Sequence, residues 1–105
     1  METIIMRSAP IYFLPLATII LSGSAAAYSG ENLASQTKVT MAQAIAIAQH
    51  ARPGKVTDKE LEREGGGSGL RYSFDILANG VTYEVGVDAV TGKVLENGPE
   101  GKNPD

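Results

Sequence analysis

The sequence predicts an α+β domain in which one helix packs on a small antiparallel sheet of three to four strands. An apolar stripe with helical spacing follows a capping sequence at Thr40. Two segments, 70–76 and 81–87, alternate apolar and polar residues and are joined by Asn79-Gly80, a strong hairpin signal. The helical stripe is the natural cover for the apolar face of that hairpin.

Residues 1–27 have the features of a secretory signal peptide. Arg7 supplies the positive charge, 11–21 is an apolar run, and small residues precede the expected cut after Ala27. The apolar run is shorter than the roughly 20 residues that span a bilayer, which argues against a membrane anchor. Met6 is an alternative start to the first methionine. We therefore expect a periplasmic or secreted protein with no stable membrane span after cleavage.

Composition limits the classes of function. The chain has 105 residues, enough for one ordinary domain, and a net charge of −3. This weak acidity argues against a nucleic-acid partner, which usually meets a basic patch. No cysteine is present, so no disulfide can reinforce the domain in an oxidising compartment. A single modest core of this size rarely gives more than about 3–5 kcal/mol of stability.

The folded unit is expected at residues 39–95, after a polar and flexible leader at 28–38. Its helix opens at Thr40, whose hydroxyl can accept a hydrogen bond from the Gln43 N–H while the Gln43 side chain reaches back, a capping box. Pro53 ends the helix, because the residue before a proline is pushed out of the helical region. The stripe expected to face the sheet includes Ala44, Ile45 and Ala48.

The segment 55–64 contains good helix formers but no apolar helical face. As a strand it places its acidic residues on one face and Leu61 on the other, and such charges block edge-to-edge pairing. We therefore expect an edge strand. Its acidic residues are Asp58, Glu60, Glu62 and Glu64. The glycine-rich run 65–69 is expected to be a mobile connector, because the lysine and strand-to-helix context of a phosphate cradle are missing.

The Asn79-Gly80 turn fixes the register of the hairpin. A two-residue loop pairs Ala78 with Val81. Stepping outward places every large apolar side chain on one face, whereas a one-residue slip would scatter them to both faces. The pairs predicted to form the core under the helix are Tyr72 with Val87, Phe74 with Val85, and Ile76 with Tyr83.

A tight turn follows the second hairpin strand. The Asp88 carboxylate can accept backbone N–H groups two or three residues on, and Gly92, next to Thr91, can take positive φ. Residues 93–95 then return as a short strand. Residues 96–105 are rich in glycine and proline and predict a disordered tail.

Taken in order, these elements resemble the PepSY domain. The resemblance rests on the capped, alanine-rich helix at 40–48, the Arg-Pro-Gly link at 52–56, and the closing signature at 83–88 and 91–95. It covers about residues 39–95 and implies an α+β domain with a helix on an antiparallel sheet.

The resemblance also implies a protein partner. The family occurs in propeptides of secreted metallopeptidases and in stand-alone envelope proteins, where it is proposed to restrain peptidases. Because no peptidase follows in this sequence, we expect action on a separate secreted or periplasmic peptidase, with 56–64 and 93–95 as candidate edges for strand addition. The alternative is an envelope module that binds a ligand, a metal ion or a protein without inhibiting it.

We expect no catalytic residue, no metal and no cofactor. His50 is the only histidine and lies near the helix C-terminus, where its partial charge suits the helix dipole. One histidine without cysteine does not make the usual zinc site. Ser68 and Ser73 have no evident base. The acidic strand lacks the spacing of a calcium-binding loop, so a solvated face is the simpler interpretation.

Overall fold

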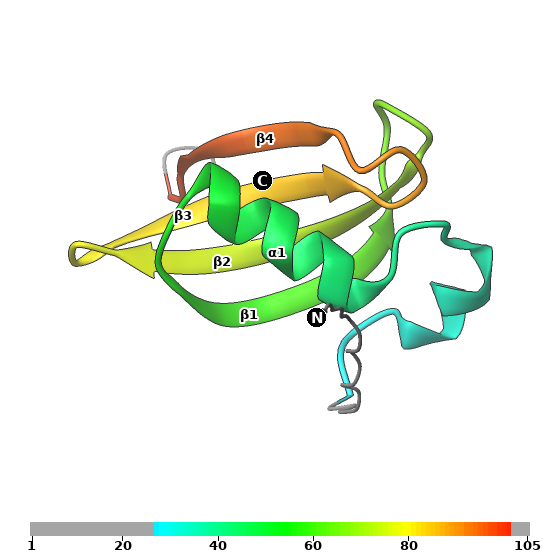
Figure 1. The fold of residues 1–105 in the computed structure, drawn as a ribbon, viewed down its shortest axis with the longest axis horizontal. Helices are drawn as coiled ribbons and strands as arrows, with labels where there is room; N and C mark the ends of the chain where they lie inside the picture. The colour runs from blue at the N-terminus through cyan, green and yellow to red at the C-terminus, as the bar shows by residue number, and fades with distance from the viewer. Residues whose placement is uncertain (1–26, 102–105) are drawn as a thin grey trace, which may run out of the picture.

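The computed structural model describes residues 27–101 and has the predicted α+β arrangement (Figure 1). One helix, α1, packs on a four-stranded antiparallel sheet whose strands follow chain order. The elements are η2 (Glu31–Gln36, a 3-10 helix), α1 (Met41–Ala51), β1 (Lys55–Arg63), β2 (Leu70–Ala78), β3 (Val81–Asp88) and β4 (Val94–Pro99). The predicted signal peptide falls almost entirely outside the described residues. Within the part of the chain that is described, no helix is long and apolar enough to cross a membrane.

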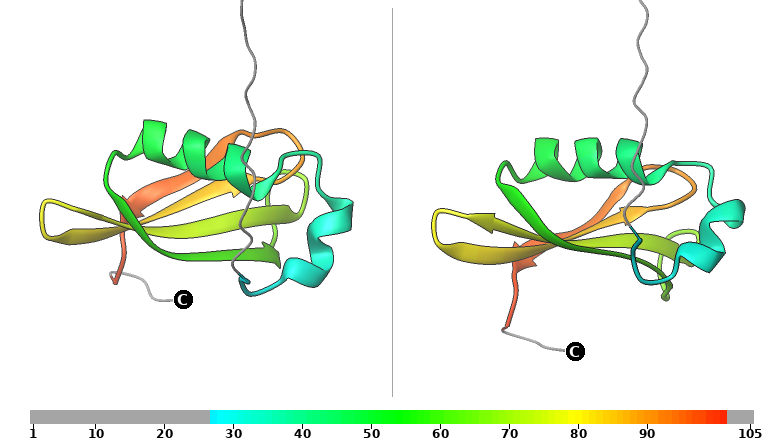
Figure 2. Two further views of the ribbon diagram at one scale, coloured as in Figure 1. Left: turned by 60° about the horizontal axis from the view of Figure 1, so that its bottom comes forward. Right: turned by 90° about the horizontal axis from the view of Figure 1, so that it is seen from below.

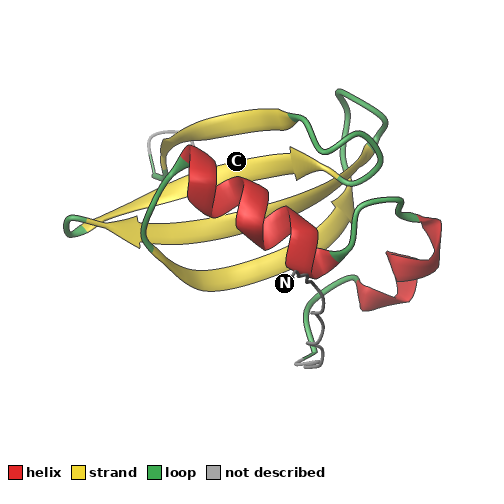
Figure 3. Cartoon of the chain, in the orientation of Figure 1, coloured by secondary structure: helices red, strands yellow, loops and turns green. Residues whose placement is uncertain are grey.

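The helix α1 begins and ends where its sequence signals are (Figure 3). The Thr40 N–H donates to Gln43 Oε1 at 2.9 Å, and the Gln43 N–H donates to Thr40 Oγ1 at 3.1 Å, which completes the capping box. At the other end the Arg52 N–H donates to the Ala48 carbonyl at 2.8 Å. Pro53 follows, so the helix cannot continue.

The β2–β3 hairpin has the predicted register, with Ala78 opposite Val81 and the three predicted core pairs following outward. Asn79 and Gly80 have φ of 53° and 77°, the two positive values that a tight two-residue hairpin turn requires. The predicted edge strand is also present, because β1 lies at one end of the sheet.

The core lies between α1 and one face of the sheet (Figure 2). Of the residues predicted to form it, Ile45 and Tyr83 are only partly buried, and the Arg52 guanidinium lies 3.8 Å from the centre of the Tyr83 ring. The others are buried, and so are three further residues, Leu61, Leu70 and Ala89. The buried apolar residues are Ala44, Ala48, Leu61, Leu70, Tyr72, Phe74, Ile76, Val85, Val87 and Ala89.

The expectation of a flexible leader at 28–38 is wrong. Tyr28 and Leu33 pack against the core, and the segment between them reaches the edge of β1. There the Leu61 N–H donates to the Ser29 carbonyl at 2.8 Å. The physical reason is that an edge strand has unpaired backbone groups, and a nearby polar segment with two apolar anchors can satisfy them.

The boundary expected for a disordered tail is also wrong, because β4 continues to Pro99. Within the predicted tail, Glu96 pairs with Gly86 and Gly98 pairs with Glu84. Pairing with β3 outweighs the weak strand propensity of the glycine. Pro99 is tolerated because its missing N–H falls on the outer side of an edge strand.

Candidate interaction surface

The turn after β3 is built around the buried carboxylate of Asp88, which is 1% exposed. Its Oδ1 accepts the N–H groups of Val90 at 2.8 Å and Thr91 at 3.0 Å. Gly92 has a φ of 80°, and its N–H donates to the Asp88 carbonyl at 2.9 Å. The residues of the closing signature therefore hold the backbone of this turn in place.

A third donor to Asp88 comes from far away in the sequence. The Ser68 N–H donates to Asp88 Oδ2 at 2.6 Å. Burial by itself raises the pKa of the Asp88 carboxyl, but the backbone N–H groups of Ser68, Thr91 and Val90 outweigh it and hold the pKa well below its usual range. Asp88 is thus a structural group that is ionised at neutral pH.

The glycine-rich run, predicted to be a mobile connector, makes specific contacts. The Glu64 N–H donates to the Gly69 carbonyl at 3.1 Å, and the Gly69 N–H donates to the Gly66 carbonyl at 3.0 Å. A side chain at Gly67 would collide with Asp88 Oδ2. The segment considered as a phosphate cradle therefore cradles the chain's own carboxylate. The glycines were the only sequence signal for this contact, and they do not indicate that Asp88 is the residue contacted.

The residues considered for chemistry are dispersed. His50 is exposed in the last turn of α1. The Ser73 hydroxyl donates to Glu62 Oε2 at 2.7 Å, and the Ser68 hydroxyl lies 3.3 Å from the Leu70 carbonyl. Residues 27–101 contain no group of three or more His, Cys, Asp or Glu side chains that could hold a metal ion.

Acidic side chains gather instead on the face of the sheet opposite α1, which we call the open face. No described helix covers this face (Figure 2), and the glycine-rich loop closes over only its Arg71 end. Outside the Asp88 turn, strand register and alternation place eight of the twelve acidic residues there, but only two of the nine basic residues, Arg71 and Lys55. The acidic residues of the open face are Asp58, Glu60, Glu62, Glu64, Asp75, Glu84, Glu96 and Glu100.

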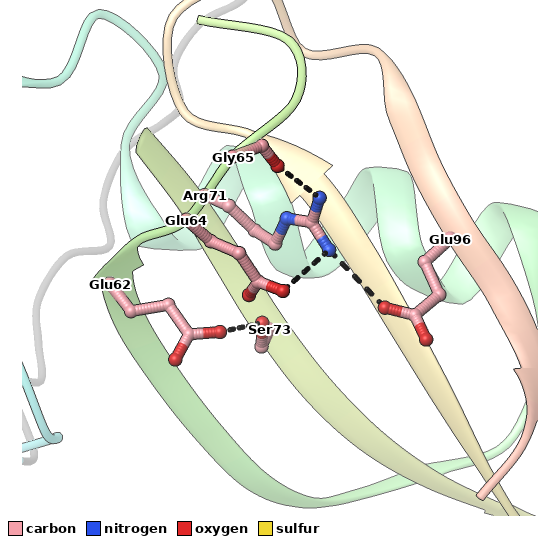
Figure 4. Close-up of polar contacts among 6 residues, drawn as sticks. All are labelled: Glu62, Glu64, Gly65, Arg71, Ser73 and Glu96. Carbon is pink, nitrogen blue, oxygen red and sulfur yellow. Dashed lines mark hydrogen bonds and ion pairs between the residues drawn. The ribbon is translucent and has the colours of Figure 1, made fainter. Parts of the chain in front are cut away.

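Arg71 lies at the centre of one end of the open face and is only 8% exposed (Figure 4). Its Nη1 is 3.2 Å from a carboxylate oxygen of Glu96 and 3.8 Å from one of Glu64, and its Nη2 donates to the Gly65 carbonyl at 3.4 Å. The side chain crosses β3 at Gly86, where a Cβ atom would lie 3.2 Å from Arg71 Cδ. Its Nε has no hydrogen-bond partner among the described residues.

The remaining carboxylates of the open face repel one another. Burial, followed by the negative charges of neighbouring carboxylates, raises the pKa values of Glu60, Asp75 and Glu84. The pKa of Glu64 is raised by its hydrogen bond to Glu62, against the opposing effect of Arg71. The fold thus holds an excess of negative charge that its own cations do not neutralise.

The two edges of the sheet differ in how much backbone they leave unpaired. The Tyr28–Ser29 segment lies along β1, and a groove of about 460 Å³ remains between it and residues 56–60. On β4, the Glu100 N–H donates to the Thr82 carbonyl at 2.9 Å. Alternate residues counted back from Glu100 therefore direct their backbone groups toward β3, and the residues between them direct theirs away from it. The backbone groups of Asn97 therefore point outward from the sheet. The β4 edge is the more open one.

Comparison with known proteins gives one match. The family model described as "Peptidase propeptide and YPEB domain", PepSY, matches residues 38–97, more than half of the chain. Neither a curated protein nor a solved structure matches. The matched region contains α1, the first three strands and most of β4. The helix on an antiparallel sheet, the Asp88 turn and this match together establish that the chain belongs to the PepSY family.

Proposed function

We propose that this chain is a non-catalytic binding module that restrains a peptidase in the cell envelope. The observation that carries the proposal is the family match across nearly the whole folded domain. PepSY domains are generally non-catalytic propeptide or regulatory modules, and they occur in extracellular or envelope proteins. Asp88 and Gly92, which belong to the closing signature, serve the fold, so binding is left to the exposed backbone and side chains.

The open edge of β4 supports strand addition as the mode of binding. An extended segment of the peptidase would pair with the outward backbone groups of Asn97. The β1 edge is the weaker candidate, because Ser29 already bonds to Leu61 there. Main-chain hydrogen bonds would supply affinity without a special side-chain site, which fits a surface that no motif marks.

The proposal includes export and cleavage after Ala27. A cut at this bond leaves Tyr28 at the N-terminus, where it packs against the core beside the edge of β1. We expect N-terminal sequencing of the protein recovered from the envelope or medium to begin at Tyr28. An intact N-terminus on the recovered protein would contradict the export route.

Inhibition is tested with two variants at one position. The purified chain, added at micromolar concentration, is expected to lower a peptidase activity of the host's envelope or secreted fraction. Asn97→Pro removes the outward backbone donor and is expected to weaken this inhibition about tenfold. Asn97→Ala is the matched control, because it loses the same side-chain contacts to Ala51 and Arg52 but keeps the donor.

The outcomes separate function from mechanism. If the unmodified chain leaves every peptidase activity of the fraction unchanged, the proposed function is wrong. If the chain inhibits but Asn97→Pro and Asn97→Ala inhibit equally well, strand addition at β4 is wrong while inhibition stands. Thermal melts of both variants show whether a lost effect reflects a lost fold.

A further inference from the structure

We propose that the open face binds a lysine- or arginine-bearing segment of the partner protein, with one basic side chain entering a notch over Gly98. This inference rests on the proposed function insofar as the chain acts by binding another protein. It adds where that protein contacts the sheet and what chemistry it presents.

Charge complementarity identifies the occupant. With eight acidic and two basic residues, the open face carries a net charge of about −6, whereas the whole chain has −3. The face is therefore more acidic than the molecule as a whole, and the remaining residues of the chain are basic on balance. Such separation of charge favours and orients a cationic partner.

The register of β4 creates a place for one cationic group. Gly98 pairs with Glu84 on β3, and Glu96 and Glu100 lie two residues away from it on either side. Residues two apart on a strand share a face, so these three side chains frame the glycine. A Cβ atom built on Gly98 meets no atom within 4 Å. We call this space the Gly98 notch.

The spacing of the frame suits an organic cation better than a metal ion. Neighbouring strands lie about 4.8 Å apart, and alternate residues of a strand lie about 6.6 Å apart. Calcium needs six or more oxygens at about 2.3–2.6 Å from one point. A guanidinium has five N–H donors in a plane and can reach separated carboxylates. An ammonium on a flexible stem can enter the same space.

The two cations of the open face do not neutralise the carboxylates around Gly98. Arg71 uses its Nη1 on Glu96 and Glu64, and Glu84 has no salt bridge among the described residues. The buried Nε of Arg71 also has no acceptor within the described part of the chain. An extended basic segment supplies the cation that Glu84 lacks, since its side chains are positively charged.

The test uses a hexa-arginine peptide as the probe and amide chemical shifts of the whole purified chain as the readout. We expect shifts concentrated at Glu84, Glu96 and Gly98, and affinity that falls as salt is added. Gly98→Thr fills the notch without changing the charge. Because Gly98 lies outside the positive-φ region and has open space, the variant should fold normally. We expect it to bind the peptide about tenfold more weakly.

Gly65→Thr is the matched control. Gly65 also lacks positive φ and has no atom within 4 Å of a built Cβ, but it lies in the β1–β2 loop. It should bind like the unmodified chain. Glu84→Gln gives a second route, since it removes a charge from the frame while keeping the side-chain shape, and it should weaken binding by a similar factor.

Three outcomes would overturn the inference: equal binding by Gly98→Thr and Gly65→Thr, shifts centred on α1, or the same shifts with calcium chloride alone at equal affinity. Its failure is distinguishable from failure of the proposed function. Peptide binding without any peptidase inhibition removes the proposed function but leaves the cationic site. Inhibition that survives both Gly98→Thr and Glu84→Gln removes the cationic site but leaves the function.

Discussion

Replacing Asp88 by asparagine is expected to lower the free energy of unfolding by about 2–3 kcal/mol, a large part of the stability of so small a domain. The amide keeps one carbonyl oxygen for Val90 and Thr91, which donate to Oδ1. It places an N–H₂ group where Oδ2 accepts from Ser68, so two donors face each other in a buried site. Urea denaturation followed by circular dichroism measures the loss.

The pH dependence of this loss follows from the direction of the pKa shift. The folded-state pKa of Asp88 lies below the unfolded value of about 3.9, so the ionised carboxylate stabilises the fold at neutral pH. That stability is lost as the pH falls below about 4 toward the folded-state pKa. The difference between the unmodified chain and Asp88→Asn should therefore narrow from pH 7 to pH 2. A constant difference would show that ionisation contributes nothing.

Asp75→Asn is a control at a carboxyl group whose pKa is shifted in the opposite direction. Burial, followed by the charges of Glu100 and Asp58, raises the pKa of Asp75, so its ionised form is the disfavoured one in the folded state. Neutralising it should leave the stability at pH 7 unchanged or slightly higher. Equal losses in Asp75→Asn and Asp88→Asn would mean that removal of any carboxylate is harmful, and the specific role of Asp88 would be wrong.

Replacing Gly67 by alanine is expected to destabilise the domain by about 3 kcal/mol. Part of the cost, about 1–2 kcal/mol, comes from placing a side chain at a φ of 56°. The rest comes from the collision of the new Cβ with Asp88 Oδ2, which pushes the loop away and breaks the bond from Ser68. Denaturant melts of the purified variant measure the sum.

Gly69→Ala separates these two contributions. Gly69 also has positive φ, 91°, but a Cβ there has no neighbour within 4 Å. The stability of Gly69→Ala should fall only by the cost of the backbone conformation. We expect Gly67→Ala to be less stable than Gly69→Ala by about 1–2 kcal/mol. Hydrogen exchange of the Ser68 amide gives an independent readout, since it should be faster in Gly67→Ala alone. Equal stability of the two variants would contradict docking of the loop on Asp88.

Local signals in the sequence were reliable wherever one short segment contains all the interacting groups. The capping box of α1 needs only Thr40 and Gln43, which are three residues apart. The hairpin register needs only the Asn79-Gly80 turn and the alternation on either side of it. The Asp88 turn was predictable in part for the same reason, because two of its three backbone donors follow within three residues.

The errors arose where a segment obtains its order from a distant partner. Residues 28–38 and 96–99 have polar, glycine-containing sequences that predict no structure of their own. Each is ordered by backbone hydrogen bonds to a strand, β1 for the first and β3 for the second. Composition reports the side chains of a segment, whereas a strand edge offers main-chain groups to any sequence that reaches it.

The sequence by itself determined the fold class, the register of the hairpin and the family, because these follow from periodicity, turn chemistry and a motif that are continuous along the chain. Only the tertiary structure decided the partner of the glycine run and the gathering of acidic residues on one face. The Ser68–Asp88 bond and the frame around Gly98 each join residues from different elements. Their proximity depends on the order of strands in the sheet, a property of the packed molecule that no local pattern contains.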